Sequence, residues 1–335
     1  MKKIAFDLMQ NDNGLQHGIN AALDFVKNNS DYNVILVGDK NEIDKFLIKD
    51  HPNIEIYDVK DVVPKTNVNL REILRKKTSM SQAIELLANN KVDAVLSSGD
   101  SGAYLTLATM KLKRLQNVLR PAFMPMIPKM NNNEFFLLLD AGANLETKAE
   151  YLEQWAIIAT IFSQNLFNKK QPICRLINIG TEKDKGFEFH QKANVLLENN
   201  NIVNYQGFIE TRNIFSLDTD IVLADGYSGN LTLKALEGTV LNLSKLIKTK
   251  ITQTFWRKIF ALGLKKAFTE IKEKFDYRNV GAAWVIGING IVIKAHGSSD
   301  FKAYKGAFNQ IKIAIESKIL DKLKTEMVKL DEQQN

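Results

Sequence analysis

Residues 221–230 read IVLADGYSGN, a short apolar run that ends directly in a glycine-containing loop. This is the pattern of a buried parallel strand that ends in a loop and is followed by a helix. The pattern recurs in VLSSGDSGA (95–103), FLLLDAGAN (136–144), LINIGTEKDKG (176–186) and IVIKAHGSS (291–299). The series predicts an α/β fold in which several strand-end loops form one composite ligand site.

Strand and helix patterns alternate along most of the chain. KIAFDLM (3–9), YNVILVGD (32–39) and NIEIYDV (53–59) read as further strands, and residues 17–28, 70–77, 81–89, 150–168 and 186–197 read as helices. Such alternation is typical of a three-layer α/β/α fold with a doubly wound, mostly parallel sheet. No linker or repeat divides the 335 residues, so we expect one catalytic unit over 1–335. Right-handed crossovers are expected to bring the strand-end loops to one edge of the sheet.

One long segment departs from this alternation. Residues 231–275 are almost continuously helical in pattern and contain no proline, which predicts a long helical hairpin. Its middle mixes apolar residues with many cations, and the surface residues we single out are Lys248, Lys250, Trp256, Arg257, Lys258 and Lys265. The pattern fits a subunit interface, and it also fits a basic amphipathic surface that contacts anionic lipid or an acidic protein. Both interpretations stay open.

Composition narrows the class of protein. Lysine and arginine exceed aspartate and glutamate by 7, which indicates acidic partners without identifying them. The single cysteine, Cys174, excludes an intramolecular disulfide and fits a reducing compartment. Within PICRLINIG it is expected to be a core residue rather than a nucleophile. No apolar run reaches the roughly 18 residues of a membrane-spanning helix, so we expect a cytoplasmic protein.

No motif indicates a cofactor. The chain has no Gly-Lys-Ser/Thr P-loop and no HExxH, and the early loop DLMQND lacks the G-x-G-x-x-G of dinucleotide-binding proteins. We therefore expect neither a metal nor an organic cofactor. Nucleic acid is disfavoured as a partner, because the lysines show no regular aromatic interleaving.

Two cationic or titratable residues stand at strand-end loops. Lys185 lies at a predicted helix start, where a lysine neutralises a phosphate, although an ordinary solvated lysine fits the position equally well. His296 lies in AHGSS beside Ser298, a context that suits a proton donor.

Two pairs of acidic and amide residues bracket tight turns. Asp225 and Asn230 bracket one turn, and Asp140 and Asn144 bracket another. Such side chains commonly hold the loop itself through hydrogen bonds to the backbone. Because the two turns are expected on adjacent loops, the four residues together indicate a site.

In order and spacing, these stretches resemble one family. The matching segments are KIAFDLM, ILVGD, SSGDSGA, RPA (120–122), LLLDAGAN, LINIGTEKDKG, DGYSGNLTLKALEG (225–238), FDYRNVG and GINGIVIKAHGSS. Over nearly the full chain they resemble the bacterial phosphate:acyl-acyl-carrier-protein acyltransferases of phospholipid synthesis, the PlsX family. The resemblance implies a fold related to phosphotransacetylases and isopropylmalate dehydrogenases, a homodimer with a long helical hairpin, and peripheral contact with an anionic membrane.

The resemblance also implies a reaction. Acyl-acyl-carrier protein and inorganic phosphate would give acyl phosphate and free carrier, with a glycerol-3-phosphate acyltransferase acting downstream. Phosphate can attack the thioester itself, so the enzyme must hold phosphate in line and stabilise the oxyanion rather than supply a nucleophile. The expected phosphate- or substrate-binding residues are Ser98, Gly99, Ser101, Gly102, Asp140, Asn144, Gly229 and Ser298, and the expected catalytic residues are Lys185, Asp225, Asn230 and His296.

Two loops depart from the family's pattern. Its first loop usually reads D-x-M-G-G-D, whereas residues 7–12 here read DLMQND, and losing both glycines is expected to restrict close backbone approach to a ligand. The usual Asn-Thr of the second loop is Asp100-Ser101, and a carboxylate there is expected to repel an anion.

Two other functions stay open. One is a phosphotransacetylase for short acyl-CoA, which the basic amphipathic segment disfavours because small soluble substrates need no carrier or membrane contact. The other is a non-catalytic scaffold that binds carrier protein and membrane, with a phosphate loop altered by the changes above.

Overall fold

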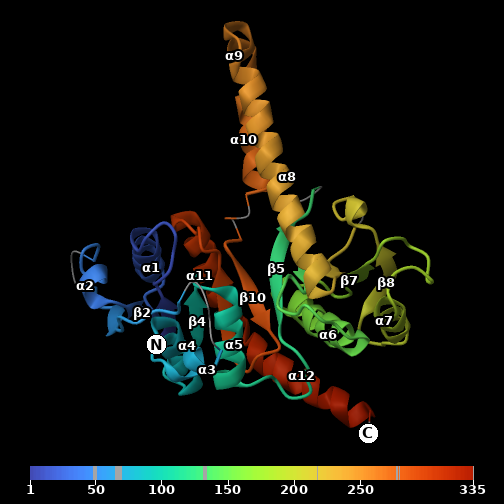
Figure 1. Cartoon of the computed structure of the whole chain (residues 1–335), viewed down its shortest axis with the longest axis horizontal. Coiled ribbons are helices and arrows are strands. Elements are labelled where there is room, and N and C mark those ends of the chain that lie inside the picture. The colour runs from blue at the N-terminus through green and yellow to red at the C-terminus, as the bar shows by residue number, and fades with distance from the viewer. Residues whose placement is uncertain are drawn as a thin grey trace.

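A computed structural model describes residues 1–47, 51–64, 70–130, 134–216, 218–276, 278 and 280–334 (Figure 1). The strands are β1 (Lys2–Asp7), β2 (Tyr32–Gly38), β3 (Ile54–Asp58), β4 (Ala94–Ser97), β5 (Ala122–Pro128), β6 (Phe135–Leu139), β7 (Ile173–Ile177), β8 (Asn204–Ile209), β9 (Ile221–Leu223), β10 (Ala282–Ile286) and β11 (Ile291–Ala295). The α-helices are α1 (Gln16–Asn28), α2 (Lys40–Ile43), α3 (Leu70–Arg75), α4 (Ser79–Ala88), α5 (Ser101–Leu112), α6 (Ala149–Leu166), α7 (Glu188–Glu198), α8 (Gly226–Thr252), α9 (Phe255–Leu262), α10 (Lys265–Lys274), α11 (Phe301–Ser317) and α12 (Ile319–Gln334).

The strands form one mixed sheet, which confirms the predicted α/β class. Its order is β3-β2-β1-β4-β11-β10-β5-β6-β9-β7-β8. Most neighbouring strands are parallel, but β10 is antiparallel to both β11 and β5, and β5 is antiparallel to β6. Three successive reversals make the half that contains β1 to β4 run opposite to the half that contains β6 to β9. The sequence patterns did not predict β5, β8 or β10.

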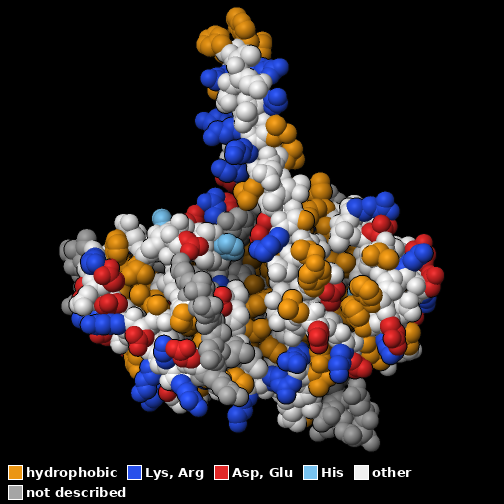
Figure 2. All heavy atoms as spheres, in the orientation of Figure 1, with side chains coloured by type: hydrophobic (Ala, Val, Ile, Leu, Met, Phe, Trp, Pro, Cys, Tyr) orange, Lys and Arg blue, Asp and Glu red, His pale blue; other side chains and the backbone are white. Residues whose placement is uncertain are grey.

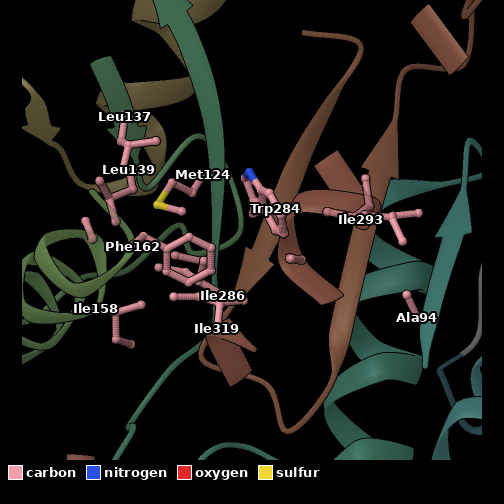
Figure 3. Close-up of a cluster of buried hydrophobic side chains, with 14 of the residues drawn as sticks. Ala94, Met124, Leu137, Leu139, Ile158, Phe162, Trp284, Ile286, Ile293 and Ile319 are labelled. Atoms are coloured by element: carbon pink, nitrogen blue, oxygen red, sulfur yellow. The ribbon is translucent and has the colours of Figure 1, made fainter. Parts of the chain in front are cut away.

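The core continues across the junction of the two halves. In Figure 3, Trp284 of β10 lies beside Met124 of β5 and Phe162 of α6, with Ile319 of α12 lower in the view. The Phe162 and Trp284 rings meet edge to face, with centroids 5.3 Å apart. This shared apolar layer fixes β5 and β10 between the two halves, at the place where the candidate site lies.

Gly281, at the start of β10, is a position that only glycine can occupy. Its φ is +80°, and a Cβ there would lie 1.9 Å from the carbonyl oxygen of Ala303. The missing side chain lets the start of β10 lie against the first turn of α11. Gly281 also lines the central cavity described below.

A helical arm formed by α8, α9 and α10 projects from the sheet and its helices (Figure 1). Neither α9 nor α10 buries a residue, and α8 buries only Gly226, Gly229 and Thr232, all in its first two turns. The cations singled out above are all exposed on this arm, and Trp256 is also exposed. Within the described residues, no helix combines the length and the apolar character needed to cross a bilayer.

Replacing Gly281 by alanine should lower the free energy of unfolding by about 3 kcal/mol. Overpacking contributes typically 1–3 kcal/mol and left-handed backbone roughly 1–2 kcal/mol. Gly207→Ala is a matched control, because its φ is +79° and no atom lies within 4 Å of the added Cβ. Chemical denaturation of both variants separates the two contributions. An equal loss of stability in Gly281→Ala and Gly207→Ala would show that the structure accommodates the contact with Ala303 at no energetic cost.

Candidate active site

A buried carboxylate organises the loop after β6. Asp140, which is fully buried, accepts hydrogen bonds from the backbone N–H groups of Gly142, Ala143 and Asn144 and from the Asn144 side chain. It also accepts from the Phe123 N–H at 3.0 Å, which ties this loop to β5. Asp140 and Asn144 therefore hold the loop in shape, and neither lines the central cavity described below.

The first turn of α8 packs directly on that loop. A Cβ on Gly229 would lie 1.9 Å from the Asp140 carbonyl oxygen, and one on Gly226 would lie 2.1 Å from that of Asn144. Asp225 caps the helix by accepting from the Ser228 N–H at 2.9 Å. The motif DGYSGN is thus the start of a helix that needs glycine on its contact face, and it presents Asn230 to the cavity.

The central cavity, of about 230 Å³, lies among β5, β10, β11 and the first turns of α5 and α8. Its polar or charged lining residues are Ser101, Asn230, Lys234, Glu237, Lys294 and His296. The structure therefore brings together Ser101, Asn230 and His296 of the residues predicted from sequence. The remaining walls are largely apolar and include Phe123, Met126 and Leu233.

Lys294 is the functional candidate that the sequence analysis missed. It is only 8% exposed, and its ammonium donates a hydrogen bond to the carbonyl oxygen of Ala295. Among the described residues, no carboxylate oxygen lies within 4.0 Å of its Nζ. Burial lowers the pKa of Lys294 from 10.5 to about 8, against the opposing field of Asp100, Asp7 and Asp12. A buried, weakly compensated cation at a cavity wall is suited to bind an anion.

His296 stands at the cavity rim, two residues after Lys294. Its Nδ1 lies 2.7 Å from the Ser298 hydroxyl and accepts from the Ser298 N–H at 3.2 Å. This geometry orients the imidazole and leaves Nε2 as its proton-bearing nitrogen in the neutral ring. Desolvation by the surrounding protein, together with Lys294 and Lys234, lowers the pKa of His296.

The loop after β4 presents the N-terminus of α5 to the cavity through Ser101. Ser98 is buried and accepts from the Tyr304 hydroxyl at 2.8 Å, while the Gly99 N–H donates to the Ser97 Oγ. Gly102 follows in the first turn of the helix. These residues shape the turn, and of them Ser101 lines the central cavity, at the N-terminus of a 12-residue helix, where the helix dipole favours an anion.

The two departures from the family's pattern have structural roles. Gln10 adopts φ +65°, the left-handed conformation that glycine adopts at no cost. The Asn11 amide donates to the Tyr304 hydroxyl at 2.6 Å and to the Ser299 carbonyl at 3.1 Å. Asp100 caps α5 by accepting from the Ala103 N–H at 2.8 Å. The sequence predicts that Asp100 repels an anion, but the positive charge of Lys294, which interacts electrostatically with Asp100, opposes that repulsion.

The loop after β7 does not join the central cavity, so the expectation that all strand-end loops converge is wrong for this loop. Lys185 is exposed, and its carbonyl accepts from the Asn178 side chain. The neighbouring Gly186 and His190 line a separate cavity on the other side of α8. There the buried His190 lies 3.7 Å from Asp225. Partial burial alone would raise the pKa of Asp225, but His190 and Ser228 outweigh it and lower the pKa to about 2.

Within the described ranges, no three His, Cys, Asp or Glu side chains are grouped so that they could hold a metal ion. Cys174 is fully buried in β7, away from both cavities, and burial raises the pKa of its thiol. The polar and charged groups of the central cavity are therefore two lysines, a glutamate, a histidine, an amide and the serine at a helix N-terminus. In chemistry, this α/β protein therefore offers a cavity suited to an anion.

Solved structures with this fold include a phosphotransacetylase from Streptococcus pyogenes. It aligns with a TM-score of 0.57 over 94% of both chains at 19% identity, which establishes similarity of fold. A family model described as fatty acid synthesis protein matches residues 2–322. Proteins named phosphate acyltransferase are similar along their whole length: that of Mycoplasma mobile is 53% identical over 97% of this chain and 99% of its own. That of Clostridium acetobutylicum is 37% identical over 98% and 99%.

The chain therefore belongs to the family of fatty acid synthesis proteins, as the resemblance of its motifs predicted.

Replacing Lys294 by methionine should stabilise the protein at pH 7 by about 3 kcal/mol, because the variant no longer buries an ammonium. In the wild type this cost is present in full below the folded pKa of about 8 and disappears above 10.5, since the unfolded chain binds more protons in that window. Wild-type stability should therefore rise between pH 8 and 10.5, and the variant should lack that rise.

Urea denaturation at several pH values measures both effects. Lys234→Met is the matched control, because Lys234 lines the same cavity but is exposed, and it should keep the wild-type rise in stability between pH 8 and 10.5. A Lys294→Met variant that is less stable than the wild type, and whose free energy of unfolding still rises between pH 8 and 10.5, would contradict the assignment of Lys294 as a desolvated cation.

Proposed function

We propose that this protein is a phosphate acyltransferase that transfers a long acyl chain from acyl-acyl-carrier protein to inorganic phosphate. The observation that carries the proposal is the buried Lys294 in a cavity that also holds His296, Asn230 and the N-terminus of α5. The names of the full-length relatives support the reaction class.

The cavity offers phosphate three kinds of partner. Lys294 supplies a positive charge that has little competition from water, the α5 N-terminus supplies N–H donors, and Asn230 supplies an amide. Since each group is held by the surrounding structure before the ligand arrives, little reorganisation is needed to bind the anion. Phosphate held in this way would be oriented for attack on a thioester carbonyl at the cavity rim.

The reaction needs no nucleophile from the protein. A phosphate oxygen forms a bond to the thioester carbon, a tetrahedral oxyanion develops, and the carbon–sulfur bond breaks to release the carrier's thiolate. The proton of the attacking hydrogen phosphate ends on that sulfur, and the Nε2–H of the neutral His296 ring would donate a hydrogen bond to the developing oxyanion. The products are acyl phosphate and the free thiol of the carrier protein. An acyl acceptor such as glycerol 3-phosphate, used by a downstream acyltransferase, would consume the acyl phosphate.

The helical arm supports contact with a membrane and with a second copy of the chain. Its end carries exposed apolar side chains, Phe255, Trp256, Phe260 and Leu262, which we call the apolar tip. Figure 2 shows these apolar side chains at the end of the arm and lysine and arginine side chains along its length. An apolar end flanked by cations suits an anionic lipid surface. The exposed Leu241 and Leu243, nearer the sheet on α8, suit a homodimer interface.

Activity is measured as phosphate-dependent release of carrier thiol from palmitoyl-acyl-carrier protein, with hydroxylamine trapping of the acyl phosphate. Lys294→Met should lower turnover by about 100-fold or more, and His296→Ala by about 100-fold. Lys185→Met is the comparison variant, and turnover lost there but kept in Lys294→Met would overturn the assignment of the central cavity.

The same assay separates the alternatives. Turnover of acetyl-CoA without turnover of palmitoyl-acyl-carrier protein would show a short-chain phosphotransacetylase. Folded protein that binds carrier without any turnover would show a scaffold.

Membrane contact is tested by sedimentation with phosphatidylglycerol vesicles. Phe260→Ser should weaken binding about tenfold, because burying a phenylalanine contributes about 1.5–3 kcal/mol. Phe187→Ser is the matched control, since Phe187 is 73% exposed at the N-cap of α7, away from the arm, and Phe260 is 75% exposed. Equal loss in both variants would exclude a specific role of the apolar tip. Light scattering of the same protein without lipid should give the mass of two 37.9 kDa chains.

A further inference from the structure

A second cavity, of about 420 Å³, adjoins the central one. The two cavities share Met126, Ile127, Leu233 and Glu237 as lining residues, so they lie side by side along β5 and α8. The second cavity lies at the foot of the helical arm, where α8 and α10 join the rest of the structure (Figure 1). The proposed reaction leaves this cavity unassigned.

One side of the second cavity is apolar. Its apolar lining residues come from the end of β5, from α8, from the end of α10 and from the segment before β9, and they are Met126, Ile127, Pro128, Phe215, Leu233, Leu236, Val240, Leu241, Ile271 and Phe275. Leu233, Leu236 and Val240 recur at helical spacing on one side of α8. Such a wall binds hydrocarbon and offers it no hydrogen bonds.

Three charged residues of the cavity lining, Asp276, Arg278 and Asp300, already bind one another. Arg278 donates to Asp276 at 2.7 Å from both Nε and Nη2 and to Asp300 at 2.7 Å, and Lys302 donates to Asp276 at 3.0 Å. Partial burial alone would raise the pKa of Asp276, but these donors outweigh it and lower the pKa to about 2. Because this network satisfies its own charges, it offers little to an ionic ligand.

We propose that the second cavity holds the acyl chain of the substrate, while the acyl carbonyl lies in the central cavity near Lys294 and His296. This inference rests on the proposed function. The shared lining of the two cavities favours a chain attached to the reacting group over a separate lipid, because a single substrate can then occupy both. Each methylene buried there is worth about 0.8 kcal/mol, or roughly a fourfold gain in affinity, so the cavity selects long chains.

The test is the chain-length dependence of kcat/KM, measured with acyl-acyl-carrier proteins of 4, 8 and 16 carbons. Val240→Trp fills the apolar side. We expect it to lower kcat/KM for the 16-carbon substrate at least tenfold, while the 4-carbon substrate changes less than threefold. Leu236→Phe, a milder filling, should shift the profile in the same direction. The matched control is Val195→Trp on the exposed face of α7, which lines neither cavity and should keep the wild-type profile.

An unchanged chain-length profile in folded Val240→Trp and Leu236→Phe would overturn the proposal, as would an equal loss for all three chain lengths. Binding of palmitate, followed by calorimetry, separates this result from failure of the proposed function. In one outcome, the wild-type protein shows no turnover and still binds palmitate, with at least tenfold lower affinity in Val240→Trp than in the control Val195→Trp. That result would refute the acyltransferase reaction and retain the acyl cavity. Equal palmitate affinity in wild type and Val240→Trp would exclude the cavity.

Discussion

The buried carboxylate of Asp140 connects the elements on which both cavities depend. It accepts N–H groups from its own loop after β6 and from Phe123 at the start of β5, so the two strands keep a fixed relation at that end. The first turn of α8 rests on the same loop through Gly226 and Gly229, at distances that no side chain allows. Since β5 and α8 form walls of both cavities, the position of Asn230 and the shape of the apolar side follow from this one buried group.

Sequence patterns predicted the parallel strands other than β8, because each is a largely apolar run, and most of these runs are followed by a loop that contains glycine. They did not predict β5 and β10, the two antiparallel strands at the centre. β5 reads AFMPMIP, and its two prolines lack the N–H that a central strand normally donates. β10 is a five-residue strand whose partners are set by tertiary packing around Trp284 and Phe162. Pairing direction between distant segments leaves no mark in either local pattern.

Lys294 was overlooked although a signal was present. In IVIKAHG a lysine follows three apolar residues of a buried strand, where a charged residue is costly unless it has a function. Side chains two positions apart lie on one face of a strand, so His296, already singled out, indicated the side to which Lys294 points. The sequence patterns instead favoured Lys185 as the phosphate-binding lysine, because Lys185 lies in a glycine-rich loop. The structure places that loop across α8 from the central cavity, a relation that depends on where α8 lies and not on local sequence.

The first turns of α8 border the separate cavity of His190 through Ser228, Leu231 and Thr232, and the central cavity through Asn230 and Leu233. Its next turns form the apolar side of the second cavity, and its far end leads to the apolar tip. A helix of 27 residues spans about 40 Å, so one rigid element joins these features. If the proposed function holds, the order of features along α8 matches the order of groups in the substrates. The first turns lie at the anionic reacting end, and the next turns lie along the apolar acyl chain. The acyl phosphate product has the same polarity, so the helix that selects its chain also leads toward a surface suited to receive it.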